Sequence, residues 1–179
     1  MKKRVKFLCK KKGQVWIETV LYTMIALILI GAVLAFVIPK ISEIRDQTII
    51  EQSVGIMQNI DNMIFSVAQG GAGNKRMMDL TLKKGTLNIN PEEGLISFEI
   101  ESEYAYSEPG NEVNIGSITA LTEEIGSTNK ITLTSNYSNY NLTYNENSQE
   151  KAISAAATPY KMIIENRGGI KTNINIVVS

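Results

Sequence analysis

The first pattern along the chain is a long apolar segment that follows a polar beginning. From Val20 to Ile38, nineteen consecutive residues carry no charge. As a helix rising about 1.5 Å per residue, residues 14–38 would be about 37 Å long. The hydrocarbon core of a bilayer is about 30 Å thick. Residues 14–38 are therefore predicted to form a transmembrane helix that spans the bilayer with some tilt.

Apolar residues continue beyond Pro39 with the spacing of a helix. They recur mostly every three or four residues, which is the period of one helical face. This stripe comprises Ile41, Ile44, Ile50, Val54, Met57, Ile60, Ile64 and Val67. Pro39 removes one intrahelical hydrogen bond, so we expect a kink rather than an end. The glycine-rich residues 70–74 are expected to stop the helix.

One helix over residues 14–69, about 84 Å long, is therefore predicted. Its stripe is expected to pack on the rest of the same chain. Contact with other subunits is the alternative, and one helix can do both.

From residue 75 the period changes to that of strands. Residues 95–106 alternate, with Ile96, Phe98 and Ile100 on one face and acidic residues on the other. This run and residues 86–90 flank the turn residues 91–94, as in a hairpin. Further strands are expected at 130–134, 140–144, 159–165 and 170–178, with a turn at 166–169 between the last two. The predicted fold is α+β: a long hydrophobic N-terminal helix followed by an antiparallel β-rich, sandwich-like head domain over residues 75–179.

Basic residues gather before the apolar segment. Seven Lys and Arg lie within residues 1–13, and no Asp or Glu precedes Glu18. Such an excess of positive charge beside a membrane helix stays in the cytoplasm. We therefore expect a cytoplasmic N-terminus and an extracellular C-terminal domain. The alternatives are a buried core helix and a conventional secretory signal cut near residues 33–35. The apolar run exceeds the usual 7–15 residues of such a signal.

The residues around the start of the apolar run suggest processing. Lys12, Gly13 and Gln14 precede the run, and Glu18 lies near its beginning. In these residues the chain resembles archaeal type IV pilin-like proteins with class III signal peptides. The resemblance covers about residues 10–40. It implies that a prepilin peptidase cleaves between Gly13 and Gln14 and removes residues 1–13 as a cytoplasmic basic leader.

The same resemblance implies a function. It indicates a structural subunit, or pilin, of an archaeal type IV pilus-like surface filament that polymerises through its N-terminal helix. In that arrangement Glu18 of one subunit pairs with the new Gln14 amine of another. The implied partners are the peptidase, copies of this chain or other pilins, and the membrane that holds the precursor. The alternative is a single-pass, membrane-anchored extracellular adhesin or receptor that does not polymerise. A secreted hydrolase or sugar-binding domain is a third reading.

Two places depart from the family's common pattern. Trp16 and Tyr22 stand where serine and leucine are frequent in the family. The resemblance therefore leaves the subfamily and the processing enzyme open.

The composition argues against an enzyme and against a nucleic-acid partner. The chain has no histidine, and its one cysteine, Cys9, lies in the predicted leader. These absences remove the commonest general base and the commonest transition-metal ligands. The acidic row Glu99, Glu101 and Glu103 lacks the spacing of an EF-hand and is expected to be a solvated strand face. We therefore expect no catalytic residue, no metal and no cofactor. Removing residues 1–13 leaves eleven basic against eighteen acidic side chains, which disfavours nucleic-acid binding.

Two sequons lie in an Asn-, Ser- and Tyr-rich stretch, at Asn136 and Asn141. In an exported protein they are candidate N-glycosylation sites. The pattern also arises by chance in such a stretch, so occupation stays open. Tyr137, Tyr140 and Tyr144 are expected to be half-buried strand residues, with a sugar-stacking surface as the alternative.

Overall fold

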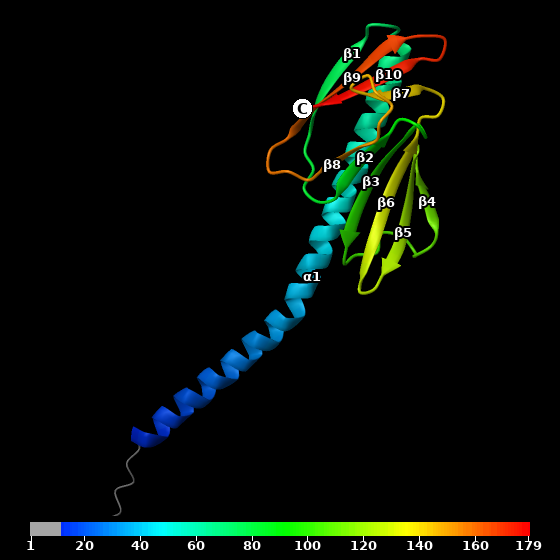
Figure 1. Ribbon diagram of the computed structural model, residues 1–179. Coiled ribbons are helices and arrows are strands. Elements are labelled where there is room, and N and C mark those ends of the chain that lie inside the picture. Colours follow the sequence, from blue (N-terminus) through cyan, green and yellow to red (C-terminus); the bar gives the residue numbers. More distant parts are fainter. Residues whose placement is uncertain (1–11) are drawn as a thin grey trace, which may run out of the picture. The chain divides into compact units, whose positions relative to one another are not determined.

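The computed structural model describes residues 12–179, and their side chains from residue 15 onward. A helix, α1 (Lys12–Gln69), precedes ten strands (Figure 1). The chain divides into two compact units, Met1–Ser42 and Glu43–Ser179, so the boundary lies within α1. The strands are β1 (Lys75–Leu80), β2 (Thr86–Asn90), β3 (Leu95–Ser102), β4 (Glu112–Ile115), β5 (Ile118–Ile125), β6 (Thr128–Asn136), β7 (Asn141–Tyr144), β8 (Lys151–Ser154), β9 (Tyr160–Gly168) and β10 (Asn173–Val178).

Helix α1 ends where the sequence predicted. It passes through Pro39 without ending and stops at Gln69. Gly71 follows with φ +79°, a left-handed conformation that glycine adopts without strain. The side-chain amide of Asn166, from β9, donates to the carbonyls of Val67 and Ala68 at 3.2 and 3.3 Å. A strand residue thus satisfies carbonyls that the last helical turn leaves unpaired.

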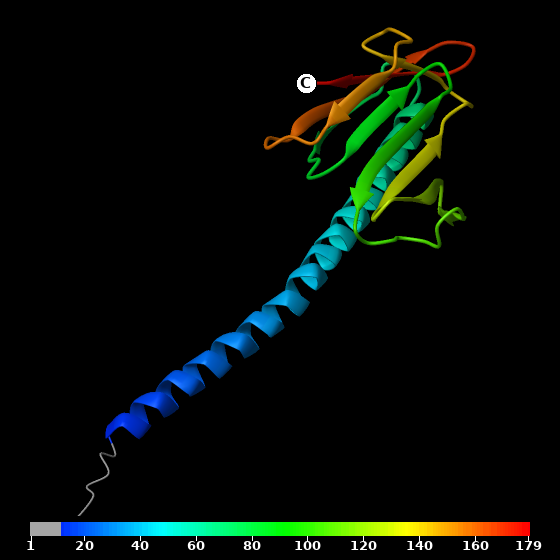
Figure 2. The same ribbon diagram turned by 60° about the horizontal axis from the view of Figure 1, so that its bottom comes forward.

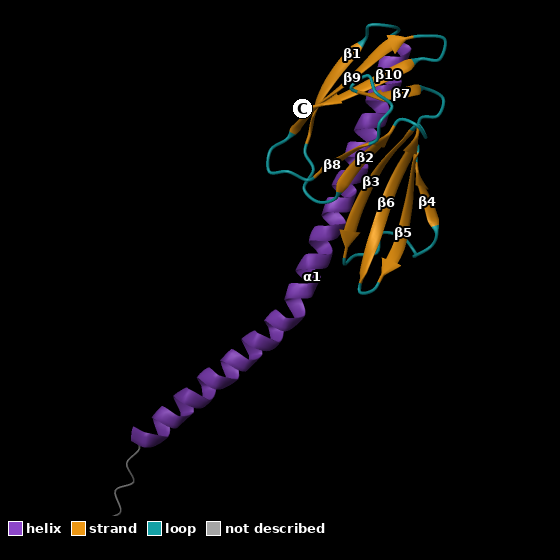
Figure 3. Cartoon of the chain, viewed as in Figure 1, coloured by secondary structure: helices purple, strands orange, loops and turns teal. Residues whose placement is uncertain are grey.

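The strands form two sheets (Figure 3). One has four strands in the order β1-β9-β10-β7, and the other has six in the order β4-β5-β6-β3-β2-β8. The predicted β2–β3 hairpin is confirmed, with Thr86 opposite Glu99 and Asn90 opposite Leu95. The pairings are antiparallel except that of β7 with β10, which is parallel. The α+β prediction is therefore confirmed.

The core of the second unit is built around the latter half of α1. Figures 1 and 2 show this part of the helix lying against both sheets. The stripe from Ile50 to Val67 is buried in one cluster with inward-facing residues of both sheets, as expected for packing on its own chain. The earlier stripe positions Ile41 and Ile44 stay exposed. A sandwich of sheets alone therefore does not describe this unit, because the helix supplies part of its core.

Several elements differ from the sequence-based expectation. Strands β1, β4, β5 and β8 have no predicted counterpart. Strands β1, β4 and β8 lie at sheet edges and are four to six residues long, so they carry few buried positions. In β5 the inward positions include Ala120 and Thr122, which weaken the apolar alternation. Residues 166–168, expected in a turn, belong to β9.

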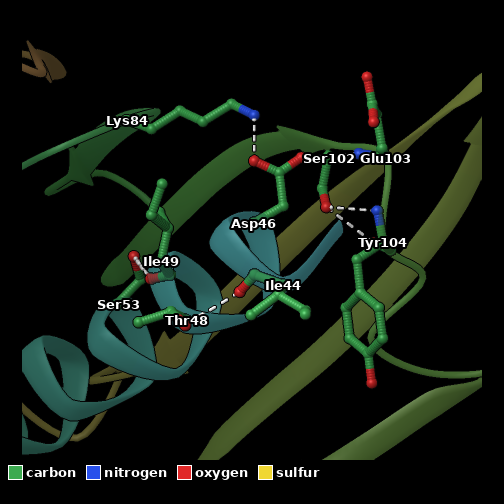
Figure 4. Close-up of polar contacts among 9 residues, drawn as sticks. All are labelled: Ile44, Asp46, Thr48, Ile49, Ser53, Lys84, Ser102, Glu103 and Tyr104. Carbon is green, nitrogen blue, oxygen red and sulfur yellow. Dashed lines mark hydrogen bonds and ion pairs between the residues drawn. The ribbon is translucent and has the colours of Figure 1, made fainter. Parts of the chain in front are cut away.

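The expected strand 95–106 ends early, at Ser102, for a specific reason. The N–H of Glu103 turns away from the sheet and donates to Oδ2 of Asp46 on α1 at 2.8 Å. The Ser102 hydroxyl then bonds to both the N–H and the carbonyl of Tyr104, at 2.9 and 2.8 Å. These contacts form a bend in place of a strand (Figure 4).

Asp46 joins α1 to the β-rich part of its unit. The side chain is buried, and its Oδ1 accepts a hydrogen bond from Nζ of Lys84 at 2.7 Å. Burial by itself would raise the pKa of the Asp46 carboxyl. The hydrogen bonds from Lys84 and from the N–H of Glu103 outweigh burial and hold the pKa below its ordinary value of 3.8.

Replacing Asp46 with Asn should destabilise the protein in a pH-dependent way. Because the folded-state pKa is lowered, the charged carboxyl stabilises the fold above about pH 4, and this contribution is lost as the pH falls through the folded value. At pH 7 we expect a loss of about 1.5–3 kcal/mol, the usual range for hydrogen bonds to a charged group. Near pH 3 the difference from the wild type should shrink.

Urea unfolding of the detergent-solubilised full chain at both pH values measures this effect. Glu124→Gln, which neutralises an exposed carboxylate, is the matched control. An equal loss at both pH values would show that the charge of Asp46 contributes nothing.

Candidate membrane and assembly segment

The apolar part of α1 is exposed. Among the described residues, α1 is the helix long and apolar enough to cross a membrane, and none of its most apolar stretch is buried. Large apolar side chains are exposed on every side of the helix. They are Val15, Trp16, Ile17, Val20, Leu21, Tyr22, Met24, Ile25, Leu27, Ile28, Leu29, Ile30, Val33, Leu34, Phe36, Val37 and Ile38.

This exposed surface favours an apolar environment. Burying one such side chain contributes about 1.5–3 kcal/mol, so burying seventeen of them would contribute tens of kcal/mol. A helix that is apolar all round is typical of a bilayer or of the core of a larger assembly. The segment is therefore compatible with a transmembrane helix.

The hydroxyl groups in this segment are compatible with lipid. Oγ1 of Thr19 donates to the carbonyl of Val15 at 2.9 Å, and Oγ1 of Thr23 donates to the carbonyl of Val20 at 2.8 Å. Each threonine hydroxyl hydrogen thus has a partner on its own helix, which removes most of the cost of placing it in hydrocarbon. Glu18 is the one charged side chain within residues 15–38, and it is exposed.

The predicted processing site lies at the beginning of α1. The helix begins at Lys12, two residues before the expected start, so the backbone of Gly13 and Gln14 is helical. Most of the predicted leader, residues 1–11 with Cys9, lies outside the described residues, as do the side chains around the junction. A protease that cut at the predicted site would have to unwind this turn, and glycine would lower that cost because it weakens a helix by about 1 kcal/mol.

The acidic row does not form a metal site. Glu99 lies 3.2 Å from Nζ of Lys130 on the neighbouring strand, while Glu103 has left the strand. Within residues 12–179 no group of three or more Asp, Glu, His or Cys side chains is placed to hold a metal ion.

The two sequons lie on either side of the crossing between the sheets. Asn136 is the last residue of β6 and Asn141 the first of β7, and both side chains are exposed. Tyr137 is more deeply buried than expected, in the turn between them. Burial, helped by the charge of Asp61, raises the pKa of Tyr137 well above its ordinary value. Tyr140 and Tyr144 are half-buried, as expected, but only Tyr144 lies in a strand, since β7 begins after Tyr140.

Sequence reasoning missed Asp46 because its partners, Lys84 and Glu103, are distant in the chain. The signal available was an acidic residue within an otherwise ordinary helical stripe.

We compared the chain with protein-family models, curated proteins and solved structures, and none of them matches it.

Charges placed in the middle of the apolar segment should prevent stable membrane insertion. Leu27, Ile28 and Leu29 are exposed near its centre. Replacing all three with Arg should cost about 9 kcal/mol, at about 3 kcal/mol for each central arginine. We expect the triple Arg variant to be extracted from membranes by alkaline carbonate, whereas the triple Ala variant stays. Retention of the Arg variant would argue against insertion of this segment.

Proposed function

We propose that this protein is a pilin-like structural subunit of an archaeal type IV pilus-like surface filament, made as a membrane-anchored precursor. The observation that carries the proposal is the apolar surface of residues 15–38. That surface surrounds the helix and is exposed, while the same helix contributes its stripe from Ile50 to Val67 to a folded core.

The assembly step follows from the two apolar environments that suit this surface. Lipid surrounds the helix in the precursor. In a filament, identical helices surround it and replace the lipid contacts with helix–helix packing. Because apolar side chains lie on every side, one helix can contact several neighbours at once.

Glu18 gives this assembly a register. A carboxylate in a bilayer costs about 2.5–3.5 kcal/mol at the centre and less near the interface. Cleavage before Gln14 creates a positive amine, and pairing of Glu18 with the amine of a neighbouring subunit would offset that cost. In the apolar core of a bundle such a pair interacts more strongly than in water.

The competing function is a membrane-anchored adhesin or receptor that does not polymerise. The lipid-compatible hydroxyls of Thr19 and Thr23 suit both functions. An anchor, however, needs neither cleavage at Gly13 nor a partner for Glu18. Processing and the role of Glu18 therefore discriminate between the two.

Processing is expected between Gly13 and Gln14 by a membrane prepilin peptidase. Intact-mass measurement of the surface protein should give Gln14 as the first residue. Gly13→Leu should leave an uncut precursor, because a bulky side chain blocks a narrow protease cleft. Gly31→Leu is the matched control, since a side chain at Gly31 meets nothing of this chain within 4 Å. A mature protein that begins at Met1 or Phe36 would disprove the proposed processing.

Glu18→Gln keeps the shape of the side chain and removes its charge. The variant should still be cut and stay in the membrane, yet its filament yield should fall tenfold or more, since about 1.4 kcal/mol of lost pairing changes an equilibrium constant tenfold. Electron microscopy and quantification of sheared filaments measure the yield. Thr19→Val, a neighbouring change without charge, is the control. A normal filament yield from Glu18→Gln would reject the pairing, and the absence of filaments from the wild type would favour the anchored adhesin.

A further inference from the structure

The two sequons lie five residues apart but have different surroundings. In each motif the third residue supplies the hydroxyl that makes Asn a glycan acceptor. That residue is Ser138 in one sequon and Thr143 in the other. Both asparagine side chains are exposed, so accessibility of the asparagine alone does not distinguish the sites.

The hydroxyl of the second sequon, on Thr143, is buried and hydrogen-bonded. Thr143 is 8% exposed, and its Oγ1 donates to Oδ1 of Asn173 at 3.1 Å and to Oδ1 of Asn175 at 3.2 Å. Both acceptors belong to β10, which pairs with β7 along the whole sequon. The N–H of Asn141 also donates to the carbonyl of Thr172 at 2.9 Å. Releasing this hydroxyl to an enzyme would require β7 to leave the sheet.

Residues 145–147, which follow β7, bond to the same group of polar side chains. The N–H of Glu146 donates to Oδ1 of Asn175 at 2.9 Å. The carboxylate of Glu146 accepts a hydrogen bond from Nη2 of Arg167 at 2.6 Å. Asn145 and Glu146 have left-handed backbones, with φ of 47° and 64°, so the chain reverses here and Asn147 pairs with Tyr144 in an antiparallel bridge. The hydrogen bonds of Glu146 add to the cost of exposing Thr143.

The first sequon lies at the end of a strand and in an exposed turn. Asn136 ends β6, and its Oδ1 accepts a hydrogen bond from the N–H of Ser138 at 2.8 Å, which forms an Asx turn. Ser138 is exposed and lies in the turn, outside both sheets. The buried side chain of Tyr137 anchors the turn from beneath. Asn136 and Ser138 can therefore reach an enzyme while the two sheets stay intact.

The surface beside Asn136 suits a saccharide. Asn136 lines an open groove of about 290 Å³ on the outer face of the six-stranded sheet. Hydroxyl-bearing side chains also line it, namely Ser117, Thr119, Thr132 and Thr134. Hydroxyl groups both donate and accept hydrogen bonds, as sugar hydroxyls do.

We propose that folding selects between the sequons, so that the folded protein accepts an N-linked glycan at Asn136, whereas Asn141 accepts one only while β7 is unpaired. The donor is a lipid-phosphate-linked oligosaccharide. Nδ2 of Asn136 attacks the anomeric carbon, the bond from that carbon to the phosphate oxygen breaks, the amide loses one proton and the lipid phosphate leaves. The selection does not depend on filament assembly, so it can fail or hold independently of the pilin proposal.

The test compares folded protein with isolated peptides. The full chain in detergent micelles, shown to be folded by a cooperative thermal transition, is incubated with a lipid-linked oligosaccharide. The enzyme is a purified single-subunit oligosaccharyltransferase that accepts Asn-x-Ser/Thr peptides. Mass spectrometry gives the occupancy of each site. Peptides covering residues 132–140 and 137–147 serve as the unfolded reference.

Both peptides should be modified, whereas in the folded chain Asn136 should be modified at least tenfold faster than Asn141. Ser138→Ala should abolish modification of Asn136. Arg167→Gln removes the charged hydrogen bond to Glu146, the residue that bonds to Asn175 beside Thr143. This change should raise modification of Asn141. Ser148→Ala, a change at an exposed serine outside both sequons, is the control.

Two results would overturn the proposal. One is modification of Asn141 in the folded chain as fast as in its peptide. The other is a folded chain left unmodified at Asn136 while the peptide of residues 132–140 is modified.

Discussion

The arrangement of this protein depends on a change in what surrounds α1 along its length. From Val15 to Ile38 the helix exposes large apolar side chains on all sides, whereas from Ile50 to Val67 it buries one stripe against two sheets. One continuous helix therefore has to satisfy two environments. Moving the large apolar side chains of the first part from water into an apolar environment would gain tens of kcal/mol. The first part is therefore compatible with a bilayer, whereas the second part obtains its apolar contacts from its own folded unit.

The transition between the environments is marked by polar contacts. Asp46 lies just before the buried stripe and takes hydrogen bonds from Lys84 and from the backbone of Glu103. At the other end of the helix, Asn166 donates to the last carbonyls of α1. Both contacts connect the helix to residues distant in sequence. The buried stripe contributes hydrophobic stabilisation, which has no preferred direction. The two polar contacts fix the position of the helix along its axis within the unit.

The sequence predicted those parts of the fold whose signal is local and periodic. The apolar run, the stripe beyond Pro39, the glycine stop after Gln69 and the β2–β3 hairpin each follow from spacing or turn chemistry. The short edge strands β1, β4 and β8 were missed because four to six residues show too few alternations between apolar and polar positions. The end of β3 at Ser102 was missed because it depends on a carboxylate 57 residues away along the chain from Glu103. The difference between the sequons was hidden for the same reason, since Thr143 meets its partners, Asn173 and Asn175, only in the folded sheet.

The proposed function connects the helix to a chemical event at its beginning. In the proposed precursor, the nitrogen of Gln14 is an uncharged amide, and the nearby charges are the cations of residues 1–13, which would hold that end of the chain on the cytoplasmic side. Glu18 then has no partner at the same depth in a neighbouring subunit. Cleavage removes those cations and leaves one positive amine four residues from Glu18. A single peptide bond would thus separate a state in which lipid is the best environment from one in which a bundle of identical helices is better. In this scheme the apolar surface keeps the helix out of water in both states, and the charge pair determines when and in which register assembly occurs.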